Sequence, residues 1–143
     1  MGVLTDIVAV DRRLSRRVFK SACPAREFDG LDARGIDQVK LGTLRAVLTG
    51  GEYDPSFMSG SLHSGGEDGP WVFEVPEDLV RRLAALTAGQ LAAAGTKWAA
   101  AEEFSPEYAD WPAEAVQQVL TALAGLCKRA VRENKPVLMW MSL

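Results

Sequence analysis

The sequence predicts a single α+β domain spanning residues 1–143, with a small, mostly antiparallel sheet of about three strands packed against about five helices. Two observations support this prediction. Short apolar or β-branched segments near the start, middle and end of the chain are typical of strands, and the longer segments between them repeat apolar residues at helical spacing. A chain of 143 residues, 48% of them hydrophobic, can bury one core but is too short for a second.

The first 35 residues are expected to form a strand, a helix and a turn. Residues 3–10 are β-branched and alternate weakly, as strands do. Asp11 can cap a helix that continues to about Ala22, before Pro24 stops it. Two glycines in the segment 27–35 indicate a turn-like connection.

Residues 37–75 are expected to form a helix, a long loop and a short strand. Asp37 can cap a helix over about 38–48, in which Val39 and four further apolar residues repeat at helical spacing. The loop 51–70 is longer than most connections in compact domains, and loops of that length are usually functional or disordered. The WVFEV segment at 71–75 predicts a strand.

The second half of the chain reads as three helices followed by a strand. The expected segments are 77–86, 88–103, 112–134 and 137–143. Thr87 and Gln90 have the spacing of a capping box, and Pro112 suits the first position of the longest helix. The sequence leaves open whether the last strand is central or an exposed edge, and an exposed apolar edge would favour a homodimer.

Few residues suit metal binding or nucleophilic catalysis. The single histidine, His63, and the two cysteines, Cys23 and Cys127, cannot supply a standard zinc ligand set, so neither a metal nor a cofactor is expected. His63 stands in the long loop, whereas a catalytic base needs a rigid seat. Cys127 lies on the apolar seam of its helix, which indicates an inert core residue, and Cys23 is interpreted as structural.

The loop also contains a G-x-x-x-x-G pattern, from Gly60 to Gly65, which matches the first half of a phosphate-binding P-loop. Gly66 and Glu67 follow where a P-loop requires Lys and Ser or Thr. A carboxylate in place of the cation argues against phosphate binding, so the P-loop interpretation is rejected.

Acidic and basic residues are grouped in separate segments of the chain. Residues 46–80 contain seven acidic side chains and no Lys or Arg, and residues 98–127 contain five acidic side chains and again no Lys or Arg. We call these two segments the acid-only stretches. Together they could form one negative surface, which would attract a basic protein and repel nucleic acid. The alternative is that these acids only keep the protein soluble.

A basic stripe on the helix expected over 11–22 is the competing feature. It could hold phosphate or RNA, although four cations on one exposed helix face are more often a solvated face. The stripe consists of Arg13, Arg16, Arg17 and Lys20.

Aromatic residues within or beside the acid-only stretches favour binding over solubility alone, because interfaces often use aromatic anchors ringed by charge. The expected partner-binding residues are Glu52, Tyr53, Asp54, Phe57, His63, Glu67, Asp68, Trp71, Glu107, Tyr108, Asp110 and Trp111.

The order of these segments resembles the YfbM-like family of uncharacterised bacterial domains. The features that carry the resemblance are the Met1-Gly2 start leading into a strand and helix, the helix that closes in Leu-Thr-Gly at 48–50, and the acidic loop before the strand at 71–75. The long final helix running into an apolar strand adds to it, whereas the segment 28–37 departs from the more aromatic stretch expected there. The resemblance implies an α+β fold and brings no established catalytic residues.

These observations together favour a non-enzymatic bacterial protein that binds and neutralises another protein. The expected activity is that of an immunity protein, which blocks a basic toxin domain through an acidic surface. A cytoplasmic location is expected, because no apolar run approaches the roughly 18 residues of a membrane span and the N-terminus lacks the basic start of a signal peptide. The alternative is a small-ligand-binding protein or enzyme with a cleft under the 51–70 loop, using His63, Asp54 and Glu67.

Overall fold

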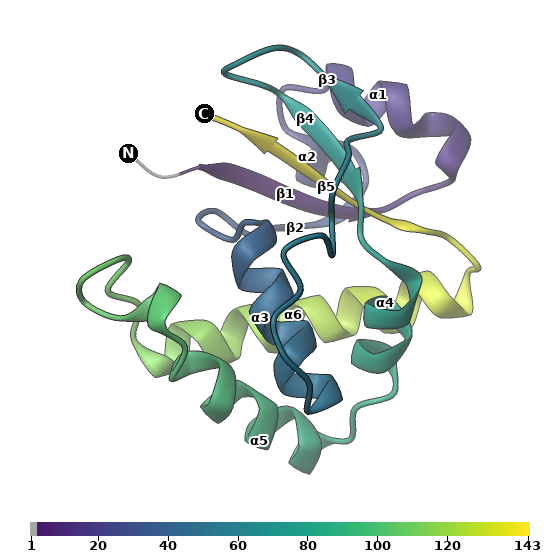
Figure 1. Ribbon diagram of the computed structural model, residues 1–143. Helices are drawn as coiled ribbons and strands as arrows, with labels where there is room; N and C mark the ends of the chain where they lie inside the picture. Colours follow the sequence, from purple (N-terminus) through teal and green to yellow (C-terminus); the bar gives the residue numbers. More distant parts are fainter. Residues whose placement is uncertain (1–2) are drawn as a thin grey trace.

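The computed structural model describes residues 3–143 and arranges them as a five-stranded antiparallel sheet with helices on both faces (Figure 1). The strand order is β2-β1-β5-β4-β3, and all four pairings are antiparallel. The strands are β1 (Leu4–Ala9), β2 (Asp29–Asp32), β3 (His63–Ser64), β4 (Trp71–Glu74) and β5 (Val137–Ser142). The predicted α+β class is therefore confirmed, whereas the prediction of about three strands was too low.

Six α-helices cover the two faces of the sheet unequally within residues 3–143 (Figure 1). One face carries α3 (Gln38–Thr49), α4 (Glu77–Ala84), α5 (Ala88–Ala99) and α6 (Ala113–Arg132). The other face carries the short helices α1 (Ser15–Lys20) and α2 (Pro24–Glu27). Two short 3-10 helices, η1 (Arg12–Leu14) and η2 (Glu102–Phe104), precede α1 and α6, respectively. The larger layer of helices makes the main core, and the smaller layer encloses a second apolar cluster.

The central strands β1 and β5 are apolar on both faces because each face is covered. Ile7 and Met139 point into the main core, whereas their neighbours Val8 and Leu138 point into the second cluster, and all four are fully buried. The terminal strand therefore lies between β1 and β4 and is not an edge. The exposed-edge argument for a homodimer does not apply to this arrangement, and dimerisation stays a prediction.

The two strands missed by sequence analysis lie in segments that look like loops. Gly30 and two aspartates make β2 resemble a turn, yet its residues 29–32 pair with β1. His63 and Ser64 pair with β4, so the second half of the 51–70 segment is a hairpin and not a loop. β2 depends on β1, which is distant in sequence, whereas β3 has only two residues and pairs with the next strand, β4. Local propensity indicates neither strand.

The helix expected over 11–22 is also broken into shorter pieces. η1 and α1 end at Lys20, Ser21 is extended, and Pro24 opens α2 instead of only ending a helix. Pro at a first helical position is favourable, because its missing N–H would have no helical partner there. Among residues 3–143, no helix combines the length and the apolar character that crossing a membrane requires.

Candidate functional site

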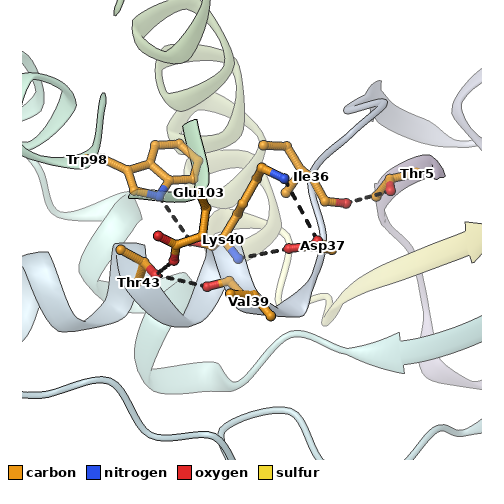
Figure 2. Close-up of polar contacts among 8 residues, drawn as sticks. All are labelled: Thr5, Ile36, Asp37, Val39, Lys40, Thr43, Trp98 and Glu103. Carbon is orange, nitrogen blue, oxygen red and sulfur yellow. Dashed lines mark hydrogen bonds and ion pairs between the residues drawn. The ribbon is translucent and has the colours of Figure 1, made fainter. Parts of the chain in front are cut away.

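The first turn of α3 is fixed by hydrogen bonds from other segments (Figure 2). The Asp37 carboxylate accepts a hydrogen bond from the Lys40 backbone N–H at 2.9 Å, and it lies 3.8 Å from the Lys40 Nζ. The indole Nε1–H of the buried Trp98 donates to the Lys40 carbonyl at 2.9 Å. These bonds cap the helix and tie its start to α5, so this turn is a firm platform.

The acid-only stretch 98–127 approaches this platform directly. Thr43 donates a hydrogen bond to the carboxylate of Glu103, as Figure 2 shows. Phe104, the neighbour of Glu103, is buried against Trp98 in an edge-to-face contact with ring centroids 5.2 Å apart. The η2 turn is therefore held on α3 by one polar and one aromatic contact.

The other acid-only stretch crosses the same helix after α3 ends (Figure 1). A Cβ on the buried Gly42 would stand 2.6 Å from the Tyr53 Cε1, so only glycine allows the ring to lie this close to the helix backbone. The Arg45 guanidinium lies over the Phe57 ring at 5.5 Å, and its Nε donates to Asp78 at 3.0 Å. Both acid-only stretches are thus attached to α3, at Gly42 and at its neighbour Thr43.

A cavity of about 260 Å³ lies between the start of α3 and the loop that follows the helix. Val39 and Tyr53 line it and are both 44% exposed. The cavity is lined by Gln38, Val39, Tyr53, Asp54, Pro55, Phe57, Met58, Ser59 and Gly60. A cleft under this loop was part of the alternative interpretation of the sequence, which did not include the contribution of α3. Val39 fits the apolar helical repeat that predicts a buried position, and it is instead a cavity wall.

Among residues 3–143, Asp54 supplies the only carboxylate in the lining of this cavity. Its Oδ1 accepts hydrogen bonds from the Ser56 hydroxyl at 2.7 Å and from the Ser56 backbone N–H at 2.9 Å. Because these bonds favour the charged form, they lower the pKa of Asp54. Within residues 3–143, Oδ2 receives no hydrogen bond. The cavity therefore carries an ionised carboxylate with one oxygen available.

The twelve residues expected to bind a partner do not form one site. Tyr53, Asp54 and Phe57 come together in the cavity, and Glu52 is exposed next to them in the chain. A second group lies on the β3–β4 hairpin and a third in the connector between η2 and α6. The hairpin group is His63, Glu67, Asp68 and Trp71, and the connector group is Glu107, Tyr108, Asp110 and Trp111.

The hairpin group includes a Ser–His contact that sequence analysis did not anticipate. His63 Nε2 and Ser15 Oγ are 2.9 Å apart, and the His63 ring lies 5.4 Å from that of Phe19. His63 therefore has a fixed seat against α1. Within residues 3–143 no carboxylate hydrogen-bonds to His63, and neither His63 nor Glu67 lines the cavity that contains Asp54. A Ser–His pair without an orienting group or an adjoining cavity lacks the parts that nucleophilic catalysis needs.

Some aromatic residues of the hairpin and the connector pack against the protein, and one is exposed to solvent. Trp71 pairs with Met141 and packs against the main core. Trp111 packs on Phe104, with ring centroids 5.3 Å apart, and against Gly35. Tyr108 is 66% exposed. The two tryptophans are thus parts of the fold, whereas Tyr108 is available to a partner.

Most acids of the acid-only stretches have no cationic partner. Three of the twelve form ion pairs, namely Glu74 with Arg12, Glu77 with Arg81 and Asp78 with Arg45. The other nine form none among residues 3–143: Glu52, Asp54, Glu67, Asp68, Glu102, Glu103, Glu107, Asp110 and Glu114. Their negative charge is therefore directed to solvent or to a partner.

A second cavity, also of about 260 Å³, lies where the end of α6 meets η1 and α4. The charged side chains that line this cavity already form ion pairs. Arg12 donates two hydrogen bonds to Glu74, and Arg81 binds Glu77 at 2.8 Å. These contacts to Glu74 raise the pKa of Arg12. Because Arg12 and Glu74 are 62 residues apart, no local pattern in the sequence could reveal this cavity.

The structure offers no clear centre for metal or thiol chemistry. Within the described part of the chain, no three His, Cys, Asp or Glu side chains are placed to hold a metal ion. Cys127 is fully buried, and burial raises the pKa of its thiol to about 12. Cys23 is exposed and forms no disulfide.

The chain was compared with family models, curated proteins and solved structures. No family model, no curated protein and no solved structure matches the chain significantly. The resemblance to the YfbM-like family stays an expectation drawn from the sequence.

Proposed function

We propose that this protein binds a basic protein through the acidic surface on either side of α3, and that it acts as an immunity protein against a bacterial toxin. The observation that carries the proposal is that nine of the twelve acids in the acid-only stretches lack an ion-pair partner among residues 3–143. Four of the nine, Glu52, Asp54, Glu102 and Glu103, lie in the two segments that contact α3. Carboxylates left unpaired on a surface attract a basic partner and accelerate its encounter.

The attachment of both stretches to one helix supports a shared surface. Tyr53 contacts Gly42 on α3, and Glu103 accepts a hydrogen bond from the next residue, Thr43. The cations of α3 neutralise little of this surface, because Lys40 lies beside Asp37, outside the stretches, and Arg45 forms an ion pair with one acid of the stretches, Asp78. A partner that approaches α3 would therefore meet unpaired carboxylates from two parts of the chain.

The basic stripe supports the phosphate or RNA alternative less well. Arg13 lies 3.6 Å from Asp11, and Arg17 lies 3.7 Å from Glu27. Two of the four cations of the stripe therefore have an acidic partner. Arg16 and Lys20 remain exposed without an ion pair in the described residues. RNA binding by this stripe would weaken steeply with salt, and two free cations provide little for it.

The proposal is tested with the product of the neighbouring gene. The two proteins are co-expressed, purified through a tag on one of them, and compared in a growth assay with and without this protein. We expect a one-to-one complex that dissociates at high salt, together with protection of cells from a toxic partner. If the neighbouring toxin-like protein neither binds nor is neutralised, the proposed function is wrong.

A further inference from the structure

We propose that the cavity between α3 and the 51–62 loop receives an arginine side chain of the basic partner. This inference rests on the proposed function and specifies where the partner is recognised. The volume of about 260 Å³ is just below the roughly 300–1,000 Å³ of small-molecule sites, which suits a single side chain better than a cofactor.

The lining of the cavity matches a side chain that is apolar along its stem and charged at its end. Val39, Tyr53 and Met58 offer apolar walls, and Met58 is itself buried. Asp54 adds the single carboxylate, with its Oδ2 free of protein hydrogen bonds in residues 3–143. A long cationic side chain can pack its methylene groups on such walls while its head reaches the carboxylate.

The charges around the cavity favour a cationic guest. Asp54 is ionised at neutral pH even with an ordinary pKa, and the Ser56 hydrogen bonds lower that pKa further. The two cations on α3 form ion pairs with other acids, Lys40 with Asp37 and Arg45 with Asp78, and the charge of Arg45 makes only the smallest contribution to the lowered pKa of Asp54. Among the described residues 3–143, no Lys or Arg belongs to the lining of the cavity beside Asp54.

Arginine fits this lining better than lysine. A guanidinium can stack on an aromatic ring and bind a carboxylate through its planar N–H groups at the same time. The protein already holds one of its own arginines in this way beside the cavity, since Arg45 lies over Phe57 and binds Asp78. Tyr53, 44% exposed, and Asp54 present the same pair of groups to an outside arginine.

The test is an NMR titration of the whole ¹⁵N-labelled protein with the blocked tripeptide Ac-Ala-Arg-Ala-NH₂. The lysine and citrulline versions of the tripeptide are the comparison probes. We expect weak, saturable binding, with a Kd on the order of millimolar. The shifted amides should be those of Val39, Tyr53, Ser59 and Gly60, because these residues line the cavity.

Two variants and one control make the test specific. Asp54→Asn keeps the oxygen that Ser56 binds but removes the charge, and should weaken binding about fivefold. Glu133→Gln removes the same charge outside the acid-only stretches and outside the lining, and should change the Kd by less than about twofold. Val39→Arg places a cation in the wall at an exposed position and should abolish binding.

Other outcomes overturn the inference. Absence of saturable shifts, or shifts scattered over all the acids, would show that the cavity has no such guest. Equal binding of the lysine peptide would contradict the preference for arginine, and equal binding of the citrulline peptide would contradict the role of charge. If a toxin partner binds Asp54→Asn and wild type equally, this inference is wrong and the proposed function stands. If the tripeptide binds but no basic protein partner is found, the inference stands and the proposed function is wrong.

Discussion

The acidic side chains serve different purposes in two regions of the molecule. Outside the acid-only stretches, five of the seven acids form ion pairs. Inside the stretches, three of twelve do so among residues 3–143. The paired acids are Asp11, Glu27, Asp29, Asp37 and Glu133, together with Glu74, Glu77 and Asp78. The difference indicates that most acids of the stretches do not stabilise the fold through ion pairs.

The largest expected effect on stability concerns the aromatic residues within the stretch 98–127. Trp111→Ala should lower the free energy of unfolding by about 2–3 kcal/mol, because it removes a ring packed on Phe104 and Gly35. Tyr108→Ala should change it by no more than about 0.5 kcal/mol, because the side chain is exposed. Urea unfolding measures both values. Similar losses of unfolding free energy for the two variants would contradict the distinction between the packed Trp111 and the exposed Tyr108.

A smaller effect is expected where the hairpin rests on α1. His63→Ala should lower the free energy of unfolding by about 1 kcal/mol, because it removes the Ser15 contact and the packing on Phe19. Ser15→Ala should cost slightly less, since the ring contact remains. We also expect His63→Ala to bind the basic partner as wild type does. Loss of partner binding without loss of stability would instead place His63 in the interface.

A paired and an unpaired acid should then differ in their response to neutralisation. Asp29 accepts two hydrogen bonds of 3.0 Å from Arg129, so Asp29→Asn should cost up to about 1 kcal/mol, and less at high salt. Glu107→Gln should leave stability unchanged or raise it slightly, because it removes an unpaired charge from an acidic region. Thermal unfolding at low and high salt compares them. Equal losses for both would contradict the division of the acids.

The smallest effect is a change in the titration of Asp54. The hydrogen bond from the Ser56 side chain is the largest cause of its lowered pKa, so Ser56→Ala should raise that pKa toward the ordinary range. Because the folded-state pKa lies below the unfolded one, the stabilisation by this bond is present above the unfolded pKa. It is lost as pH falls through the folded pKa. An NMR titration of the carboxyl carbon in wild type and variant gives both values, and identical pKa values would exclude the role of Ser56.

Local sequence signals predicted the elements that do not depend on distant partners. The Thr87–Gln90 capping box, the Asp37 cap and the buried seam of α6 are present as expected. β2 and β3 were missed because Gly30 and His63 stand in segments of low strand propensity, where pairing with β1 and β4 imposes the strand. The division of the segment around 11–27 into the short helices α1 and α2 was missed as well, since both are too short to show an amphipathic period.

The candidate site could be predicted only in part. The loop with Tyr53, Asp54 and Phe57 was identified from its length and composition, and these residues do line a cavity. The participation of Val39 could not be inferred, because apolar spacing gives no sign of which helix positions a loop leaves uncovered. Trp111 illustrates the opposite case, since its acidic neighbours suggest an interface while its ring packs against Phe104.

The central claim is that the unpaired acids, and not net charge alone, recognise a basic partner. It is tested by two fourfold amide variants with the same change in charge. One neutralises the unpaired Glu52, Asp54, Glu102 and Glu107, and the other neutralises the paired Asp11, Glu27, Asp29 and Glu133.

The measurement is the Kd of each variant for the toxin-like product of the neighbouring gene, by calorimetry at fixed salt. At up to about 1 kcal/mol for each lost charge contact, the first variant should bind about a hundredfold more weakly. The second should bind within about fivefold of wild type, although it should unfold more easily. Equal weakening of binding in both variants, or no weakening in the first, would contradict the account.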